Sequence, residues 1–209
     1  SMPGLKVHAK VALIKKKRQG KAISYGFIGT GNLNENTARV YSDFGLLTTD
    51  EGLTLELAKV FEFLHTKQKP KGFNELIVSQ FDAFDKFSEL IDREIRHIKK
   101  GLKGRIILKM NNLEERGLIE KIYEAAEAGV EITLIIRSIC CLKPGVENLK
   151  VIRIVDRYLE HARIFYFYNN GKEDVRMGSS DWMKRNIFRR VEVTFPIKDE
   201  TIKSQILHI

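Results

Sequence analysis

Apolar and polar residues alternate along the first part of the chain in the manner of β-strands. Apolar residues occupy every second position from Leu5 to Leu13 in the segment 5–15, and shorter apolar runs follow at residues 25–29 and 44–48. A period of two places successive side chains on opposite faces of a strand. Over residues 53–65 the apolar residues are spaced three or four apart, which is typical of an amphipathic helix. The first part of the chain therefore predicts three strands followed by a helix.

A break in this pattern follows at residues 67–73, where Pro70, Gly72 and three lysines indicate a linker. Beyond the linker, strand and helix patterns alternate. Strands are predicted at residues 74–80, 105–110 and 131–137, and helices at residues 84–100 and 114–128. This rhythm is typical of an α/β protein built in layers.

A short pattern from the start of the chain recurs near its end. The two copies begin with Val7-His8-Ala9-Lys10-Val11 and with Glu160-His161-Ala162-Arg163-Ile164. Each is followed by strand-like residues and then by a glycine-led loop, Gly29-Thr30-Gly31-Asn32 in one copy and Gly178-Ser179-Ser180-Asp181 in the other. The distance from the histidine to the first glycine is 21 residues in the first copy and 17 in the second. The same order of features in both copies indicates a duplication.

The two copies carry side chains suited to phosphoryl transfer. On a strand, residues two apart share a face, so His8 is expected beside Lys10 and His161 beside Arg163. A neutral imidazole can attack phosphorus, and a nearby cation can hold phosphate oxygens. Three short polar side chains of the loops could reach the same oxygens: Thr30, Asn32 and Ser179. The alternative, histidines with a purely structural role on two strands, stays open on this pattern alone.

The composition indicates which charge a ligand of this chain would carry. The chain has 36 Lys and Arg against 27 Asp and Glu, a net charge of +9, which suits a polyanionic partner such as polyphosphate, nucleic acid or a membrane surface. A merely solvated basic surface is an equally open alternative on composition alone. No apolar run approaches the roughly 18–20 residues of a membrane span. The neighbouring Cys140 and Cys141 form no disulfide framework and no metal site, which favours a reducing cytoplasm, and we expect both thiols to be buried.

The paired histidine strands with their glycine loops resemble the phospholipase D superfamily, in which two half-sites meet at one active site. That pattern expects an acidic residue shortly after the lysine, but Lys15-Lys16-Lys17-Arg18 stands there, which weakens a phosphodiesterase interpretation. Longer strings resemble the polyphosphate kinase family. They are Phe27 to Asp43 (FIGTGNLNENTARVYSD), Leu108-Lys109-Met110-Asn111, Ile136 to Leu142 (IRSICCL), Tyr158 to Arg163 (YLEHAR) and Ser179 to Asn186 (SSDWMKRN).

This second resemblance implies an ATP–polyphosphate phosphotransferase that works reversibly through a phosphohistidine. It implies that His8 becomes phosphorylated, that Tyr41 and Arg137 contact the nucleotide phosphates, and that His161 lies across the site as a phosphate ligand and as an acid or base. The strand and loop geometry adds three further phosphate contacts: Lys10, Asn32 and Arg163.

The resemblance also sets expectations for organisation. It implies duplicated phospholipase D-like α/β domains with mixed sheets flanked by helices. Residues 1–73 would be the C-terminal half of a first domain and residues 74–209 a second domain. The chain would be the C-terminal part of a four-domain enzyme and inactive by itself, since upstream parts would supply the adenine contacts and the arginines associated with Mg²⁺. No metal site is expected in this chain.

The expected partners are ATP or ADP and inorganic polyphosphate, with no nucleic acid, in a bacterial-type cytoplasm. Family members are often oligomeric, and both a homo-oligomer and membrane association of the whole enzyme stay open. Two other functions also stay open. A phospholipase D-like nuclease or lipid phosphodiesterase would hydrolyse a phosphodiester without ATP. A non-catalytic polyanion-binding module would need neither His8 nor His161.

Overall fold

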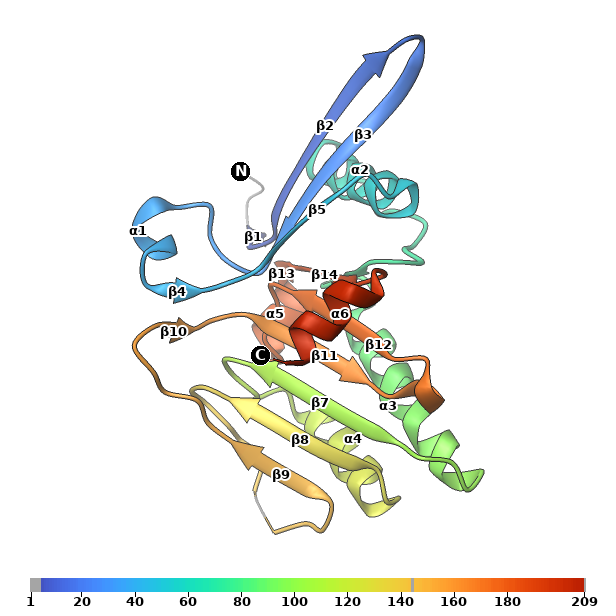
Figure 1. Cartoon of the computed structure of the whole chain (residues 1–209), viewed down its shortest axis with the longest axis vertical. Coiled ribbons are helices and arrows are strands. Elements are labelled where there is room, and N and C mark those ends of the chain that lie inside the picture. Colours follow the sequence, from blue (N-terminus) through green and yellow to red (C-terminus); the bar gives the residue numbers. More distant parts are fainter. Residues whose placement is uncertain (1–4, 144, 209) are drawn as a thin grey trace.

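The computed structural model describes residues 5–143 and 145–208 (Figure 1). The first part of the chain forms a small antiparallel sheet of order β2–β3–β5, which helix α2 covers on one face. Its elements are β1 (Lys6–Val7), β2 (Lys10–Arg18), β3 (Lys21–Gly29), α1 (Glu35–Ala38), β4 (Tyr41–Ser42), β5 (Gly45–Thr48) and α2 (Glu51–Thr66).

The remainder forms a seven-stranded mixed sheet of order β6–β14–β12–β11–β7–β8–β9. Strands β7, β8 and β9 run parallel to one another, and the other neighbours are antiparallel. The elements from here on are β6 (Ile77–Val78), α3 (Ala83–Lys99), β7 (Arg105–Met110), α4 (Arg116–Glu127), β8 (Glu131–Ile136), β9 (Leu149–Ile152), β10 (Leu159–Glu160), β11 (Arg163–Phe167), η1 (Asn169–Gly171), β12 (Asp174–Gly178), α5 (Lys184–Arg189), β13 (Arg190–Val191), β14 (Val193–Pro196) and α6 (Glu200–Leu207).

The central strand β11 separates two hydrophobic cores. Its five residues are all buried, and alternate side chains enter opposite layers. Phe165 and Phe167 join the core under α3 and α4, whereas Ile164 and Tyr166 join the core that α2 and α6 cover. A strand buried on both faces loses the polar alternation of a surface strand, which explains the continuous apolar sequence of residues 164–167.

Helix α2 shows how local chemistry sets the boundaries of an element. Asp50 begins the helix, since its carboxylate accepts a hydrogen bond from the backbone N–H of Leu53 at 2.9 Å. Lys67 ends it in the left-handed conformation with φ of 64°. A side chain at Gly26 would meet Leu57 Cδ1 at 3.0 Å, so the glycine lets α2 lie close to β3.

The hairpin of β2 and β3 extends away from the body of the protein (Figure 1). Its two-residue turn places Gln19 and Gly20 at φ of 49° and 78°, and two successive positive φ angles are typical of a type I′ turn, which suits the twist of two strands. Strand β5 pairs only with Gly26–Gly29 at the base of β3. The outer part of the hairpin is therefore a ribbon of two strands.

Each predicted helix and strand has a counterpart in the structure, but several bounds differ. The strand expected over residues 74–80 is reduced to β6, and the strand expected over residues 25–29 begins earlier, at Lys21. The expected strand over residues 5–15 is interrupted at His8 and Ala9, whose two N–H groups both donate to the carbonyl of Val191 at 2.9 Å. The expectation that both cysteines are buried is wrong. Cys140 and Cys141 are exposed, not buried, because they lie in the loop after β8, outside both cores. None of the helices within the described residues is both long and apolar enough to cross a membrane.

The two parts of the chain pack on each other. The core beneath α2 combines Ile28 and Leu57 from the first part with Val191 and Phe195 from the second. Two short parallel pairings also cross between the parts: β1 pairs with β13, and β10 pairs with β4. The fold class expected from the sequence, a duplicated α/β arrangement with a mixed sheet flanked by helices, is confirmed. The division at residues 73 and 74 stays a prediction.

Candidate active site

His8 is held on both sides of its ring. Its Nδ1 atom lies 2.8 Å from Glu192 Oε2, and its Nε2 atom lies 2.9 Å from the Nζ of Lys10. An ionised carboxylate only accepts and an ammonium only donates, so this network places the ring proton on Nδ1 and leaves the Nε2 lone pair without one. The predicted neighbourhood of His8 and Lys10 is thus confirmed.

Glu192 is fully buried and is itself fixed by neighbours. The hydroxyl of Ser179 donates to Oε2 at 2.6 Å, and the amide of Asn186 donates to Oε1 at 2.8 Å. Burial of a carboxylate is unfavourable unless its lone pairs accept hydrogen bonds. These donors and His8 together hold the carboxylate in one orientation, which in turn orients the imidazole.

The second histidine has a matching arrangement. His161 Nδ1 lies 2.8 Å from Asp43 Oδ2, and the hydroxyl of Thr30 donates to Asp43 Oδ1 at 2.7 Å. Burial lowers the pKa of His161, against the opposing effect of Asp43. Burial also raises the pKa of Asp43, but the hydrogen bonds from His161 and Thr30 outweigh it and the net shift is downward. The pair is therefore a neutral imidazole and a carboxylate at pH 7.

Each part of the chain supplies the carboxylate that binds the histidine of the other part. Asp43, which binds His161, lies in the first copy, and Glu192, which binds His8, lies in the second. The backbone repeats the exchange: the N–H groups of His161 and its neighbour donate to the carbonyl of Ser42 at 3.2 and 3.1 Å, just as those of His8 and its neighbour do to Val191. The reciprocal pairings of β1 with β13 and β10 with β4 produce this arrangement.

The two carboxylates are functional residues that the sequence interpretation missed. In both copies the carboxylate follows the hydroxyl of the glycine loop by 13 residues, from Thr30 to Asp43 and from Ser179 to Glu192. This shared spacing was the available signal. The hydroxyls of Thr30 and Ser179 were expected to reach phosphate oxygens. Both are fully buried and instead orient the two carboxylates inside the protein.

Arg163 is the counterpart of Lys10 in the second copy, but it forms an ion pair with a buried carboxylate. Its Nε donates to Asp181 Oδ1 at 3.0 Å, and its Nη1 lies 3.1 Å from Nε2 of His161. Asp181 also accepts from the backbone N–H of Asn111 at 2.9 Å. Burial raises the pKa of Asp181, but the charge and hydrogen bond of Arg163 bring it below its usual range. Arg163 is thus an internal ion-pair partner beside His161.

The two histidine clusters lie close enough for their charges to interact. Burial lowers the pKa of Lys10 to about 8; the negative charges of Glu192 and Asp43 oppose this effect, and the positive charge of Arg163 adds to it. The ring of Tyr41 lies 4.9 Å from the imidazole of His161, centroid to centroid.

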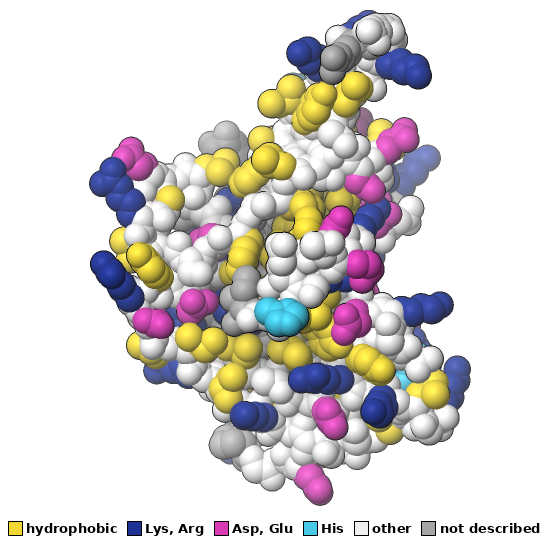
Figure 2. Space-filling model, viewed as in Figure 1, with side chains coloured by type: hydrophobic (Ala, Val, Ile, Leu, Met, Phe, Trp, Pro, Cys, Tyr) yellow, Lys and Arg dark blue, Asp and Glu magenta, His cyan; other side chains and the backbone are white. Residues whose placement is uncertain are grey.

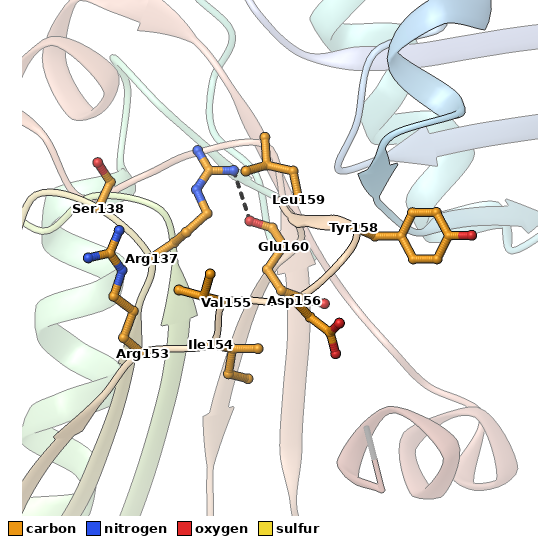
Figure 3. A pocket seen from close by; sticks show the side chains of 9 residues that line it. All are labelled: Arg137, Ser138, Arg153, Ile154, Val155, Asp156, Tyr158, Leu159 and Glu160. Carbon is orange, nitrogen blue, oxygen red and sulfur yellow. Dashed lines mark hydrogen bonds between the residues drawn. The ribbon is translucent and has the colours of Figure 1, made fainter.

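Arg137 borders the same region. Its Nη1 donates to the carbonyl of Glu160 at 2.9 Å, and burial together with the nearby Arg163 cation lowers its pKa. Arg137 lines a cavity of about 310 Å³ together with residues that include Arg153 and Tyr158 (Figure 3). A guanidinium with one hydrogen bond to protein retains donors for an anion in this cavity.

Comparison with known proteins identifies the family. The family model described as "Polyphosphate kinase C-terminal domain 1" matches residues 1–70, and "Polyphosphate kinase C-terminal domain 2" matches residues 76–209. The chain belongs to the polyphosphate kinase family. The polyphosphate kinase of Escherichia coli K12 is 44% identical over 213 residues, covering 100% of this chain and 31% of that protein. The polyphosphate kinase of Vibrio cholerae is 46% identical, covering 100% of this chain and 30% of that protein.

A solved structure agrees with this assignment. The crystal structure of polyphosphate kinase from Porphyromonas gingivalis matches with a TM-score of 0.94 at 44% identity, covering 100% of this chain and 33% of that one. The chain therefore spans about a third of the length of the polyphosphate kinases it matches, and the activity of a whole polyphosphate kinase comes to it only as a proposal.

The structure brings together most of the residues expected at a polyphosphate kinase site. Two clusters contain His8 with Lys10 and His161 with Arg163, and Tyr41 and Arg137 adjoin the second. Asn32 is exposed in the loop after β3 and has no hydrogen bond to these side chains within the described residues. The roles expected for the seven residues stay predictions.

No group of three His, Cys, Asp or Glu side chains suited to a metal ion occurs within residues 5–143 and 145–208. The carboxylates nearest the histidines, those of Asp43, Glu192 and Asp181, are already bound to a histidine or an arginine.

Proposed function

We propose that the whole enzyme to which this chain belongs moves the terminal phosphoryl group of ATP to polyphosphate and back, with His8 as the group that carries it. The observation that supports this most strongly is the state of the His8 ring. Buried Glu192 holds the proton on Nδ1, so Nε2 presents its lone pair beside the Lys10 ammonium. A nucleophile whose tautomer is fixed and which has a cation next to it is prepared for attack on a phosphoryl group.

In the first step, Nε2 of His8 attacks the γ-phosphorus of ATP. The P–N bond forms as the bond from phosphorus to the bridging oxygen breaks, and ADP leaves with the electron pair. The ring then carries a positive charge, which the ionised Glu192 at Nδ1 stabilises. Lys10 can turn from Nε2 to the phosphoryl oxygens and offset the negative charge that they carry.

In the second step, a terminal oxygen of polyphosphate attacks the phosphorus of phosphohistidine. The P–N bond breaks, and its electron pair returns to Nε2, so the enzyme is regenerated and the chain is one phosphate longer. His161 would bind the phosphate or accept its proton from across the site, since it is neutral at pH 7 and held by Asp43. Tyr41 and Arg137 would hold the nucleotide phosphates.

Mg²⁺ would enter this reaction with ATP and reduce the charge repulsion between phosphates. The described part of this chain does not fit a site for it, because Asp43, Glu192 and Asp181 are engaged by histidine or arginine. Inactivity of this chain alone, homo-oligomer formation, membrane association and a cytoplasmic location stay predictions.

The test is to map phosphohistidine on the whole enzyme. After brief reaction with ATP labelled at the γ-phosphate, we expect an acid-labile label, stable to alkali, on the peptide that contains His8. The label should move to added polyphosphate or to ADP. An acid-stable label, a label on another peptide, or hydrolysis of a phosphodiester without ATP would contradict the proposal.

The charge of Lys10 gives this reaction a predicted pH dependence. Since burial lowers the pKa of Lys10 to about 8, the ammonium loses its proton as the pH rises through that value, and phosphorylation of His8 should slow above it. A Lys10→Arg variant keeps its charge and should show no such decline. The measurement is the single-turnover rate of labelling against pH. A wild-type rate that stays constant well above pH 8 would exclude a role for the Lys10 charge.

A further inference from the structure

The positive charge of this chain is concentrated at its start. The first 34 residues contain seven Lys and Arg and no Asp or Glu, whereas the whole chain has 36 basic and 27 acidic residues. Seven of the nine net positive charges therefore belong to this segment, and the remaining 175 residues are close to neutral. Most of the segment is the β2–β3 hairpin.

The charges of the hairpin lie mainly at its tip. Lys15, Lys16 and Lys17 at the end of β2 and Lys21 at the start of β3 are all exposed. Within the described residues none of these four lysines forms an ion pair. Figure 2 shows the basic side chains at the end of the projecting hairpin, beyond a band of hydrophobic ones. Like charges gathered without acidic neighbours repel one another and favour an anionic ligand.

The hairpin connects this tip directly to the candidate active site. Strand β2 begins at Lys10, whose ammonium contacts His8, and continues to the tip. At about 3.4 Å per residue, Lys15 and Lys17 lie roughly 17–24 Å along the strand from Lys10. Between them the strand carries apolar residues such as Ile14, which is exposed. The tip is thus a cationic group separate from the site and on the same element.

We propose that the tip of the β2–β3 hairpin is a second anchor for polyphosphate, outside the site of phosphoryl transfer. This inference rests on the proposed function. A long polyphosphate molecule that is bound near His8 can also reach the lysines of the tip. The second contact is then intramolecular, so the affinity for long polyphosphate rises without any change at the site of phosphoryl transfer. A short phosphate chain cannot reach both groups. The hairpin would therefore make binding depend on chain length.

The distribution of the cations favours a thread-like polyanion over a membrane surface. Side chains alternate along β2, so Lys15 and Lys17 project from one face of the ribbon and Lys16 from the other, together with Ile14. An element that lies on a membrane separates its apolar and cationic residues onto opposite faces. Here cations surround the tip, and a flexible chain of phosphates can follow them.

The experiment compares binding of two phosphate ligands to this chain, which contains the tip and both histidine clusters. In the test variant the four tip lysines are changed to Gln: Lys15→Gln, Lys16→Gln, Lys17→Gln and Lys21→Gln. The matched control removes the same charge from four exposed lysines near the opposite end of the protein: Lys99→Gln, Lys100→Gln, Lys103→Gln and Lys172→Gln. The ligands are long-chain polyphosphate and tripolyphosphate, with binding measured at several salt concentrations.

We expect the test variant to bind long-chain polyphosphate about tenfold or more weakly than the control variant, with equal affinity for tripolyphosphate. If each lysine meets one phosphate as in single-stranded nucleic acids, the salt dependence should decrease by up to roughly 3 in log–log slope. A variant with Arg at the four positions should bind as wild type does. Thermal unfolding of each variant should be unchanged, since the tip is outside both cores.

Three outcomes would overturn the inference in distinguishable ways. Equal binding of long-chain polyphosphate by the test and control variants would exclude the hairpin tip as a polyphosphate-binding site and leave the proposed function intact. If the test variant loses as much affinity for tripolyphosphate as for long-chain polyphosphate, the lysines act on the site of phosphoryl transfer itself. Absence of polyphosphate binding by wild type, with tight binding to vesicles of phosphatidylglycerol, would contradict both the hairpin inference and the polyphosphate substrate.

Discussion

A Glu192→Gln variant of the whole enzyme is expected to phosphorylate His8 about 10³–10⁴-fold more slowly than wild type, by the effect that loss of an orienting carboxylate has on a catalytic histidine. Glu192 Oε2 now accepts from Nδ1 of His8 at 2.8 Å. An amide can donate to Nδ1 instead, which favours the tautomer with its proton on Nε2 and removes the lone pair that attacks phosphorus. The negative charge that stabilises the phosphorylated ring is also lost.

The measurement is single-turnover labelling from ATP, with His8→Ala as the variant that should take no label. Glu56→Gln is a matched control, because Glu56 is another buried carboxylate that accepts three backbone hydrogen bonds far from His8 along the chain. It should lose stability but label at a nearly normal rate. The nitrogen chemical shifts of His8 report its tautomer directly. A Glu192→Gln rate within tenfold of wild type would show that the carboxylate does not orient the nucleophile.

The largest effect on stability is expected from Asp181→Ala, which should lower the free energy of unfolding by about 3–5 kcal/mol. Asp181 is 5% exposed and Arg163 is 3% exposed. Removal of the carboxylate leaves the guanidinium buried without its 3.0 Å partner. It also removes the acceptor for the backbone N–H of Asn111. A buried charge without a partner is among the most costly defects in a protein.

Denaturant unfolding of this chain measures the effect, with Glu120→Ala as the control. Glu120 forms an ion pair with Arg116 at 2.7 Å, but both side chains are more than half exposed, so its loss should change the free energy of unfolding far less than the loss of Asp181 does. A double variant, Arg163→Met with Asp181→Leu, should recover much of the loss, since no unpaired charge remains. If Asp181→Ala matches the control, the buried pair does not stabilise the fold.

The elements of this fold follow from local patterns, and the sequence predicted them well. The helix spacing over residues 53–65 and the apolar residues of β7 and β8 each depend on neighbours within one element. The repeat also predicted that His8 lies beside Lys10, and the two side chains are in contact, although the strand on which that prediction relied begins only at Lys10.

What the sequence did not predict depends on contacts between distant parts of the chain. The bond between His161 and Asp43 joins residues 118 positions apart, and the bond between His8 and Glu192 joins residues 184 apart. The spacing of 13 residues from hydroxyl to carboxylate, shared by both copies, marks the two carboxylates, but it does not show which histidine each one binds. The same reason explains the interruption of the first strand at His8, where the backbone turns to meet Val191. It also explains the burial of Lys10, which is 8% exposed although lysine is usually a surface residue.

The exchanged carboxylates give one polypeptide the contacts of a symmetric pair. In a two-fold symmetric dimer, each subunit gives its partner what it receives, and the contacts of His8 with Glu192 and of His161 with Asp43 have that form within one chain. Identical subunits must carry identical side chains at matching positions, whereas two copies within one chain can differ. Here Lys10 contacts the imidazole of His8, and its counterpart Arg163 is paired with Asp181 inside the protein.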